Sequence, residues 1–295
     1  MEVFSTVASA LSAAALFNNC VNCFEYIQLG RHFARDFERC QLKLDTAEMR
    51  LSRWGQAIGI NDDPRFTRDQ PGDKSVQHVQ AILEEIDQLF QTLKKASKRY
   101  TIGALQEDLE HLQIQAMNPV ARKLHNRLNG IISQRQKGTS LLKKTKWALY
   151  EGKNHEKLIE QVTGFVDDLE KLFPVENARR TLVEMEIEEV NDEPSLTALQ
   201  NAATDTDSFL TQAVSERLEM YRSKNYAKSI QSEESSRVRV GNEWIEEALR
   251  YSSGQSGQTW NEADLVATRG SSAVHIGNSY GGRGIFDDQA SREPR

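Results

Sequence analysis

The sequence lacks the signature motifs of common enzymes. Its 295 residues contain no G-x-x-x-x-G-K phosphate loop and no H-E-x-x-H zinc-protease helix. We therefore expect a protein that is not an enzyme and that binds no cofactor. The histidines show no metal-ligand spacing either, so we expect no metal site. They are His32, His78, His111, His125, His155 and His275.

Cysteine is scarce, and the three residues Cys20, Cys23 and Cys40 lie near the N-terminus. An odd number of cysteines without an export signal favours a reducing compartment, so we expect a cytoplasmic location at rest. Cys20 and Cys23 form a C-x-x-C pair, but a redox site requires a strand before this motif and a helix after it. Because the pair lies inside an apolar helical run, the sequence favours buried free thiols over a redox or zinc site.

An excess of positive charge is also missing. The net charge is −6, from 37 Lys and Arg against 43 Asp and Glu, which argues against nucleic acid as a partner. Residues 222–295 carry ten charges of each sign, and proline is absent between Pro194 and Pro294. A neutral tail rich in Gly and Ser can meet copies of itself without long-range repulsion.

Apolar residues at three- and four-residue steps predict a helical body. Residues 61–74, which are polar, are expected to form a long loop. Each apolar stripe must be buried against another element, so we expect a mainly α fold with one N-terminal helical bundle over residues 1–221. The helices are expected at roughly 33–56, 76–93, 120–132, 158–173, 176–190 and 206–221.

A basic patch lies beside Trp147 and Tyr150 in the middle of the chain. One interpretation is a solvated helix face with two core aromatics, and the other is a contact for anionic lipid headgroups. The sequence leaves both open. The patch consists of Arg135, Lys137, Lys143, Lys144 and Lys146.

The N-terminal run from Val3 to Phe24 carries no charge over 22 residues. About 20 helical residues span a bilayer, but Ser, Thr and Asn make this run a poor constitutive anchor. It is either a buried central helix or a helix that is buried at rest and enters a membrane when released. The membrane-inserting candidates include Phe4, Leu11, Leu16 and Phe17.

Two stretches of the tail, 225–245 and 261–281, repeat one phrase. Seven of their 21 aligned positions are identical without a gap. In each repeat an alternating apolar pattern predicts a strand with one apolar face, and Gly241 and Gly277 permit a corner after it. We therefore predict two stacked rungs of a β-solenoid.

Stacking would place equivalent residues of the two repeats on top of one another. Asparagines in such positions form amide ladders, and opposite charges pair across the rungs. The predicted ladders are Asn225 with Asn261 and Asn242 with Asn278, and the predicted ion pairs are Lys228 with Asp264 and Glu233 with Arg269.

The backbone entropy lost on ordering each repeat exceeds what its few buried aliphatic side chains return. Two rungs alone also leave both end faces unpaired, which invites further pairing. We therefore predict a tail that is disordered in the monomer and folds by stacking on another copy, as a templated amyloid. The alternative is a small monomeric hairpin domain.

In these stretches the chain resembles the fungal HET-s/HET-S prion and heterokaryon-incompatibility proteins. FNNCVNCFEYIQLGR, RLSRWG, INDDPRF and TSLLKKTKWALY are similar to their helical HeLo domain, and the repeats with GGRGIFDD are similar to their prion-forming region. The likeness covers nearly the whole chain. It implies a HeLo-like domain at 1–221, a prion-forming domain at 222–288 and a disordered extension at 289–295.

The resemblance implies a two-part mechanism linked to programmed cell death in heterokaryon incompatibility. The tail templates a self-propagating β-solenoid, and the HeLo-like domain then refolds and inserts its N-terminal helix into the membrane. The implied partners are other copies in amyloid fibrils, NLR-type receptors with similar repeats, and lipids of the plasma membrane or cell periphery. The alternative is a non-toxic prion or adaptor whose helical domain only regulates or scaffolds amyloid assembly.

The resemblance also assigns roles to residues. Asn22 and His32 are candidates for determining activity, since toxic and inactive members of such families differ by few residues. Ile285 and Phe286 would pack as a C-terminal latch. The implied solenoid core consists of Ala227, Ile230, Val238, Val240, Ala263, Val266, Val274 and Ile276.

Overall fold

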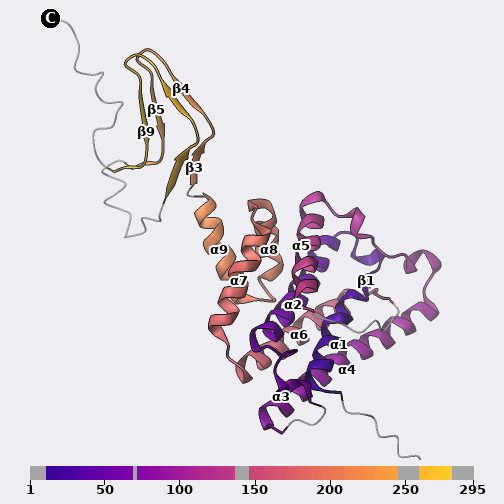
Figure 1. Ribbon diagram of the computed structural model, residues 1–295. Helices are drawn as coiled ribbons and strands as arrows, with labels where there is room; N and C mark the ends of the chain where they lie inside the picture. The colour runs from indigo at the N-terminus through magenta and orange to yellow at the C-terminus, as the bar shows by residue number, and fades with distance from the viewer. Residues whose placement is uncertain (1–10, 69–71, 137–145, 223, 245–258, 281–295) are drawn as a thin grey trace, which may run out of the picture. The chain divides into compact units, whose positions relative to one another are not determined.

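Figure 1 shows the computed structural model, which describes residues 11–68, 72–136, 146–222, 224–244 and 259–280. Packing divides the chain into two units, Met1–Ser215 and Glu216–Arg295, so the division falls inside the last helix. The first unit is helical, and the second is built from short strands.

Most helices of the first unit lie where the apolar stripes predict them. The predicted stripes at 76–93, 120–132 and 158–173 fall within α4, α5 and α6, which confirms these three helices. The helices are α1 (Ala13–Glu25), α2 (Phe37–Ile58), α3 (Pro64–Thr67), α4 (Lys74–Gly103), α5 (Pro119–Arg135), α6 (Gly152–Leu172), α7 (Glu176–Val190), α8 (Glu193–Ala203) and α9 (Ser208–Arg222).

Local signals set where these helices begin and end. The side chains of Ser12, Asp73, Asn118 and Asp192 accept hydrogen bonds from the first-turn amides of α1, α4, α5 and α8. Gly59 ends α2 in the left-handed conformation, with φ of 65°. Capping residues and a left-handed glycine, which can be recognised in the sequence, therefore set the ends of these helices.

Helix α2 is the centre of the helical unit, and α1, α5, α6, α7 and α8 pack against it (Figure 1). Its Trp54 is 1% exposed, lies 6.2 Å from the Phe17 ring of α1, and donates from Nε1 to the Leu169 carbonyl at 3.1 Å. Burial of such large side chains supplies most of the stabilisation of the bundle. The fold therefore holds α1 in place through α2.

Two three-residue strands, β1 (Ile27–Leu29) and β2 (Trp147–Leu149), pair in parallel within the helical unit. The sequence interpretation of the basic patch as a helix face with two core aromatics is therefore wrong for the segment that carries Trp147, whereas Tyr150 is buried as expected, and Lys137, Lys143 and Lys144 lie outside the described residues. Strands of this length are too short to show an alternating pattern. Three 3₁₀ turns also connect elements: Arg31–Phe33, Gln106–Leu109 and Ile114–Ala116.

The remaining differences concern boundaries and short elements. Helix α2 begins at Phe37 rather than near residue 33, and α3 lies inside the predicted polar loop. Helix α8 was not expected, and Pro194 occupies its first turn, where proline is tolerated.

The second unit consists of short strands that pair in parallel between the two repeats (Figure 1). This confirms the predicted two-rung parallel architecture, whereas disorder of the isolated tail stays a prediction. The strands are β3 (Lys224–Ala227), β4 (Ile230–Ser232), β5 (Arg237–Val240), β6 (Glu243–Trp244), β7 (Trp260–Ala263), β8 (Val266–Thr268), β9 (Ala273–Ile276) and β10 (Ser279–Tyr280).

Candidate functional site

The two repeats stack in the register that the alignment predicts. Strand β3 pairs with β7, β4 with β8, β5 with β9 and β6 with β10, and Asn225 lies opposite Asn261. Every pair therefore joins residues 36 positions apart in the chain. Each repeat is one rung, and the rungs are joined by backbone hydrogen bonds along the stack.

Asparagine side chains connect the rungs. Asn225 Nδ2 donates to Asn261 Oδ1 at 2.9 Å and to Asn242 Oδ1 at 3.1 Å. Asn278 Oδ1 accepts two hydrogen bonds, from Asn261 Nδ2 at 3.0 Å and from the backbone amide of Asn242 at 3.1 Å. The four predicted ladder residues thus form one network between neighbouring corners of both rungs.

The corners that follow β5 and β9 are each formed by a glycine, in a backbone conformation that other residues rarely adopt. Gly241 and Gly277 have φ of 157° and 152°. A Cβ on Gly241 would overlap the carbonyl oxygen of Gly277, because the two backbones lie against each other. The stacking at this corner therefore requires glycine in the first rung.

The apolar face of the solenoid is covered unequally. Ile230 in the first rung is 6% exposed, whereas its partner Val266 and the neighbouring Ile276 are 41% and 42% exposed. A further rung stacked on the second repeat would cover this apolar surface. The remaining predicted core residues are half-buried: Ala227, Val238, Val240, Ala263 and Val274.

The predicted inter-rung charge pairs are formed only in part. Glu233 and Arg269 approach to 4.0 Å on an exposed surface. Asp264 accepts a short hydrogen bond from the Tyr226 hydroxyl, and no ion pair between Lys228 and Asp264 occurs in the described part of the tail. At such exposed positions a charge pair adds little stability.

Sequence reasoning missed several contacts between the rungs. Lys224 Nζ pairs with Glu262 at 2.9 Å, and Ser272 Oγ donates to the Ser232 carbonyl at 3.0 Å. Lys224 aligns with Trp260 and Glu262 with Tyr226, so the alignment gave no signal for the ion pair, and the identity of Ser272 with Ser236 does not reveal a bond to Ser232. The predicted latch residues Ile285 and Phe286, and the segment 289–295, lie outside the described residues.

Helix α1 carries the described part of the uncharged N-terminal run. Leu16 and Phe17 are buried, at 8% and 3% exposure, whereas Leu11, just before the helix, is 46% exposed. Phe4 lies outside the described residues, as does everything before Leu11. Of the described helices, none combines the length and apolarity that a bilayer span demands. All three cysteines are buried and unbridged, in line with their prediction as buried thiols.

The two candidate activity-determining residues occupy different environments. Asn22 is half-buried in α1. His32 is exposed, and its Nε2 lies 3.0 Å from the hydroxyl of Tyr100, whose ring stacks on Tyr150 at 4.8 Å. His32 therefore contacts the aromatic pair that joins α4 to the segment after β2.

A buried charge network ties α2 to the beginning of α9. Arg53 is fully buried and contacts Glu186 at 2.8 Å and Asp207 at 2.7 Å. Burial lowers the Arg53 pKa, but the Asp207 and Glu186 charges outweigh it and raise the pKa above its usual value. Asp207 also caps α9 by accepting from the Leu210 amide at 3.0 Å. Removing one member would leave a buried charge without its partner, which is strongly destabilising.

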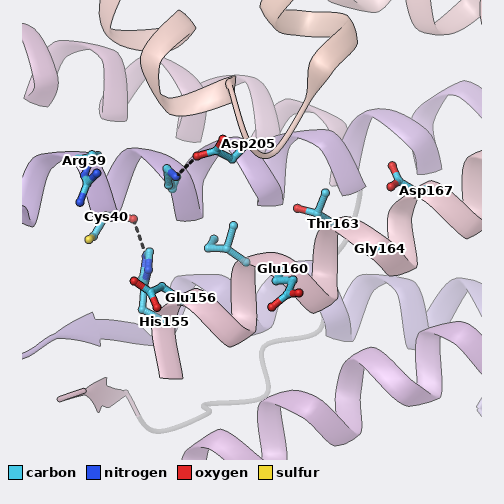
Figure 2. A pocket seen from close by; sticks show the side chains of 11 residues that line it. Arg39, Cys40, His155, Glu156, Glu160, Thr163, Gly164, Asp167 and Asp205 are labelled. Carbon is cyan, nitrogen blue, oxygen red and sulfur yellow. Dashed lines mark hydrogen bonds and ion pairs between the residues drawn. The ribbon is translucent and has the colours of Figure 1, made fainter. Parts of the chain in front are cut away.

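A cavity of about 470 Å³ lies between α2 and α6 (Figure 2). His155 Nε2 lies 3.0 Å from the Cys40 carbonyl at one end, and Lys43 pairs with Asp205 at 2.6 Å across it. Burial lowers the pKa of His155, so its ring is neutral near pH 7. The wall mixes charges of both signs, and four of them, Arg39, Lys43, Asp167 and Asp205, already have ion-pair partners, so it favours no ligand class.

Both units match families of known proteins. The family described as HeLo, prion-inhibition and propagation, matches residues 5–199, and the family described as Het-s 218-289 matches residues 217–281. The chain is 52% identical over 287 residues to heterokaryon incompatibility protein s of Podospora anserina, covering 97% of this chain and 99% of the relative. Heterokaryon incompatibility protein S of the same species matches to the same extent.

Solved structures agree with the helical unit. The HET-s N-terminal domain is 55% identical with a TM-score of 0.71, covering 72% of this chain and all of that one. A mutant form of that domain is 56% identical with a TM-score of 0.69, covering 70% of this chain and 99% of that one. The chain therefore belongs to the HeLo and HET-s prion family of heterokaryon incompatibility proteins, with a helical HeLo domain and a C-terminal prion region that self-assembles into amyloid.

Proposed function

We propose that this protein is a membrane-permeabilising cell-death effector that is activated by amyloid. At rest it is cytoplasmic and its HeLo domain is folded. Stacking of the tail on a fibril then loosens the HeLo domain, which releases α1 and the uncharged run before it to enter the plasma membrane. The protein performs this role without enzymatic chemistry.

One observation carries this proposal, namely that a single helix, α9, leads from the buried charge network almost to the start of the first rung. Asp207 holds the first turn of α9 against Arg53 of α2, α9 continues to Arg222, and β3 begins at Lys224. Helix α1 packs on the same α2 through Phe17 and Trp54. Force applied to α9 by stacking would therefore act on the helix that holds α1.

The proposed partners follow from the two units. The exposed apolar face of the second rung suits another copy of the chain or an NLR-type receptor with similar repeats. The uncharged N-terminal run suits membrane lipid. We propose no nucleic-acid partner, because the net charge is −6.

A charge at Leu11 separates this effector from an adaptor whose tail only recruits partners. Leu11 is 46% exposed in the resting fold, so Leu11→Lys leaves the core intact, and it lies near the middle of the run that would enter the bilayer. A charge at that depth costs at least about 2.5 kcal/mol. We expect Leu11→Lys to form fibrils normally and to lose most leakage of anionic liposomes after seeding.

The matched control is Met185→Lys, which places the same charge on α7 at a residue that is 58% exposed. It should retain leakage. If Leu11→Lys permeabilises liposomes as well as the parent protein does, the adaptor is the better description.

A further inference from the structure

A second cavity, of about 380 Å³, lies inside the helical unit and is distinct from the cavity in Figure 2. Its wall is formed by the end of α1, by β1, by one face of α2, by residues 112–115 and by α5. This volume is in the range of small-molecule sites. The wall combines aliphatic side chains such as Leu44 and Ile114 with several carboxylates and amides.

The carboxyl group of Glu48 lines this cavity without a partner. Glu48 is 3% exposed, and its Oε1 is buried without any hydrogen bond. Burying a carboxylate without a counter-charge is costly, so buried carboxylates in proteins are normally paired or protonated. This could not be predicted from the sequence, because Glu48 is one of many polar residues of α2.

The other titratable groups in the wall do not neutralise Glu48. Asp45 is 2% exposed, and its carboxylate accepts from Gln41 at 3.0 Å and contacts His125 Nδ1 at 2.7 Å, so these two groups satisfy each other. Glu25 from α1 adds a third carboxylate, and Lys146 is exposed at the edge. With His125 protonated and Glu48 ionised, the three carboxylates face only His125 and Lys146, so the wall lacks one positive charge.

We propose that this cavity binds a small organic cation, a primary ammonium group on a short aliphatic stem, with Glu48 as the group that recognises the charge. The ammonium would donate to the Glu48 carboxylate, whose Oε1 has no hydrogen-bond partner, and the stem would lie against the aliphatic part of the wall. A metal ion fits less well, since the described residues include no cluster of three or more His, Cys, Asp or Glu side chains arranged to hold one.

The raised pKa of Glu48 determines how amine binding depends on pH. Burial raises the pKa of Glu48 well above its usual value, and the charges of Asp45 and Glu25 raise it further. Burial lowers the pKa of His125, but its contact with Asp45 raises it overall, so a lower pH protonates both groups. Amine binding requires the ionised Glu48 carboxylate and therefore strengthens as the pH rises through the raised pKa. Stability without ligand falls over the same range, so the amine stabilises the fold more above the raised pKa than below it.

Such a ligand would also oppose activation, a consequence that rests on the proposed function. It would hold the end of α1 and β1 against α2 and α5, and thereby stabilise the resting HeLo domain. Binding itself is measured on the resting protein and does not depend on leakage. A failure to bind and a failure to permeabilise are therefore separate results.

The test is calorimetric titration of the full chain with n-butylamine at pH 6 and pH 8 and constant ionic strength. We expect one saturable site, tighter binding at pH 8, and no binding of n-butanol, which has the same stem without the charge. Glu48→Gln keeps the shape of the site and should weaken amine binding about tenfold or more. The same variant should have a higher melting temperature than the parent at pH 8, which shows that it folds.

Glu84→Gln is the matched control, because Glu84 is an exposed glutamate of α4 away from the cavity. It should bind n-butylamine as the parent protein does. Three results would each overturn the proposal: no saturable binding by the parent protein, equal weakening in both variants, or an equal stabilisation by magnesium chloride at matched ionic strength. The first would mean that the cavity holds water only.

Discussion

At the residue scale, backbone conformation at one corner decides whether the rungs can stack. Gly241 has φ of 157° and lies against Gly277 of the second rung. A side chain there meets both conformational strain and steric overlap, which together cost about 1–3 kcal/mol. We expect Gly241→Ala to raise the soluble concentration that remains beside fibrils of residues 222–295 about tenfold, measured after seeding.

The control for this prediction is Ser235→Ala. Ser235 is exposed in the turn between β4 and β5 of the same repeat, away from Gly241, so its variant should leave the soluble concentration unchanged. An unaltered concentration for Gly241→Ala would show that the corner adopts another conformation in the fibril.

At the element scale, the position of α1 depends on a close approach to α2. Gly55 has no Cβ, and the ring of Phe17 fills the space that a Cβ would occupy. Gly55→Ala should overpack this contact at a cost of about 1–3 kcal/mol and lower the melting temperature of the full chain by about 2–12 °C. If release of α1 permeabilises membranes, the variant should also leak liposomes before any seed is added.

Gly130→Ala serves as the comparison in a helix of the same unit. Nothing lies within 4 Å of a Cβ at Gly130, so alanine there should leave the melting temperature equal or slightly higher. Equal melting temperatures for the two alanine variants would mean that Phe17 moves aside without cost.

The elements also show how far the sequence predicts the structure. Helices α4, α5 and α6 follow from apolar stripes, and the rungs follow from a repeat whose alignment gives the strand register directly. The pairing of β1 with β2 could not be found, because it joins three-residue strands about 120 positions apart. The Arg53 network was missed for another reason: charges on α2 read as a solvated face unless the partner helices are known.

At the scale of the whole molecule, the dimensions of the two units conflict inside a fibril. Each chain contributes two rungs, so copies repeat at about 10 Å along the stack. A folded domain of the size of the helical unit has a radius of gyration of about 17 Å. Neighbouring copies therefore cannot all keep this domain folded close to the fibril unless the connection allows the domains to spread apart.

The connection between α9 and the first rung is too short to relieve this crowding. Helix α9 ends at Arg222 and β3 begins at Lys224. A flexible Gly and Ser linker of about 20 residues inserted between them has an end-to-end distance of about 25 Å, which is enough to separate the domains. We expect this insertion to leave seeded fibril formation unchanged and to abolish most liposome leakage.

The same linker placed within residues 245–258 adds equal length between the rungs without separating α9 from β3, and should preserve leakage. Full leakage from the first insertion would mean that amyloid activates the HeLo domain by a route other than crowding, such as a raised local concentration of released N-terminal segments.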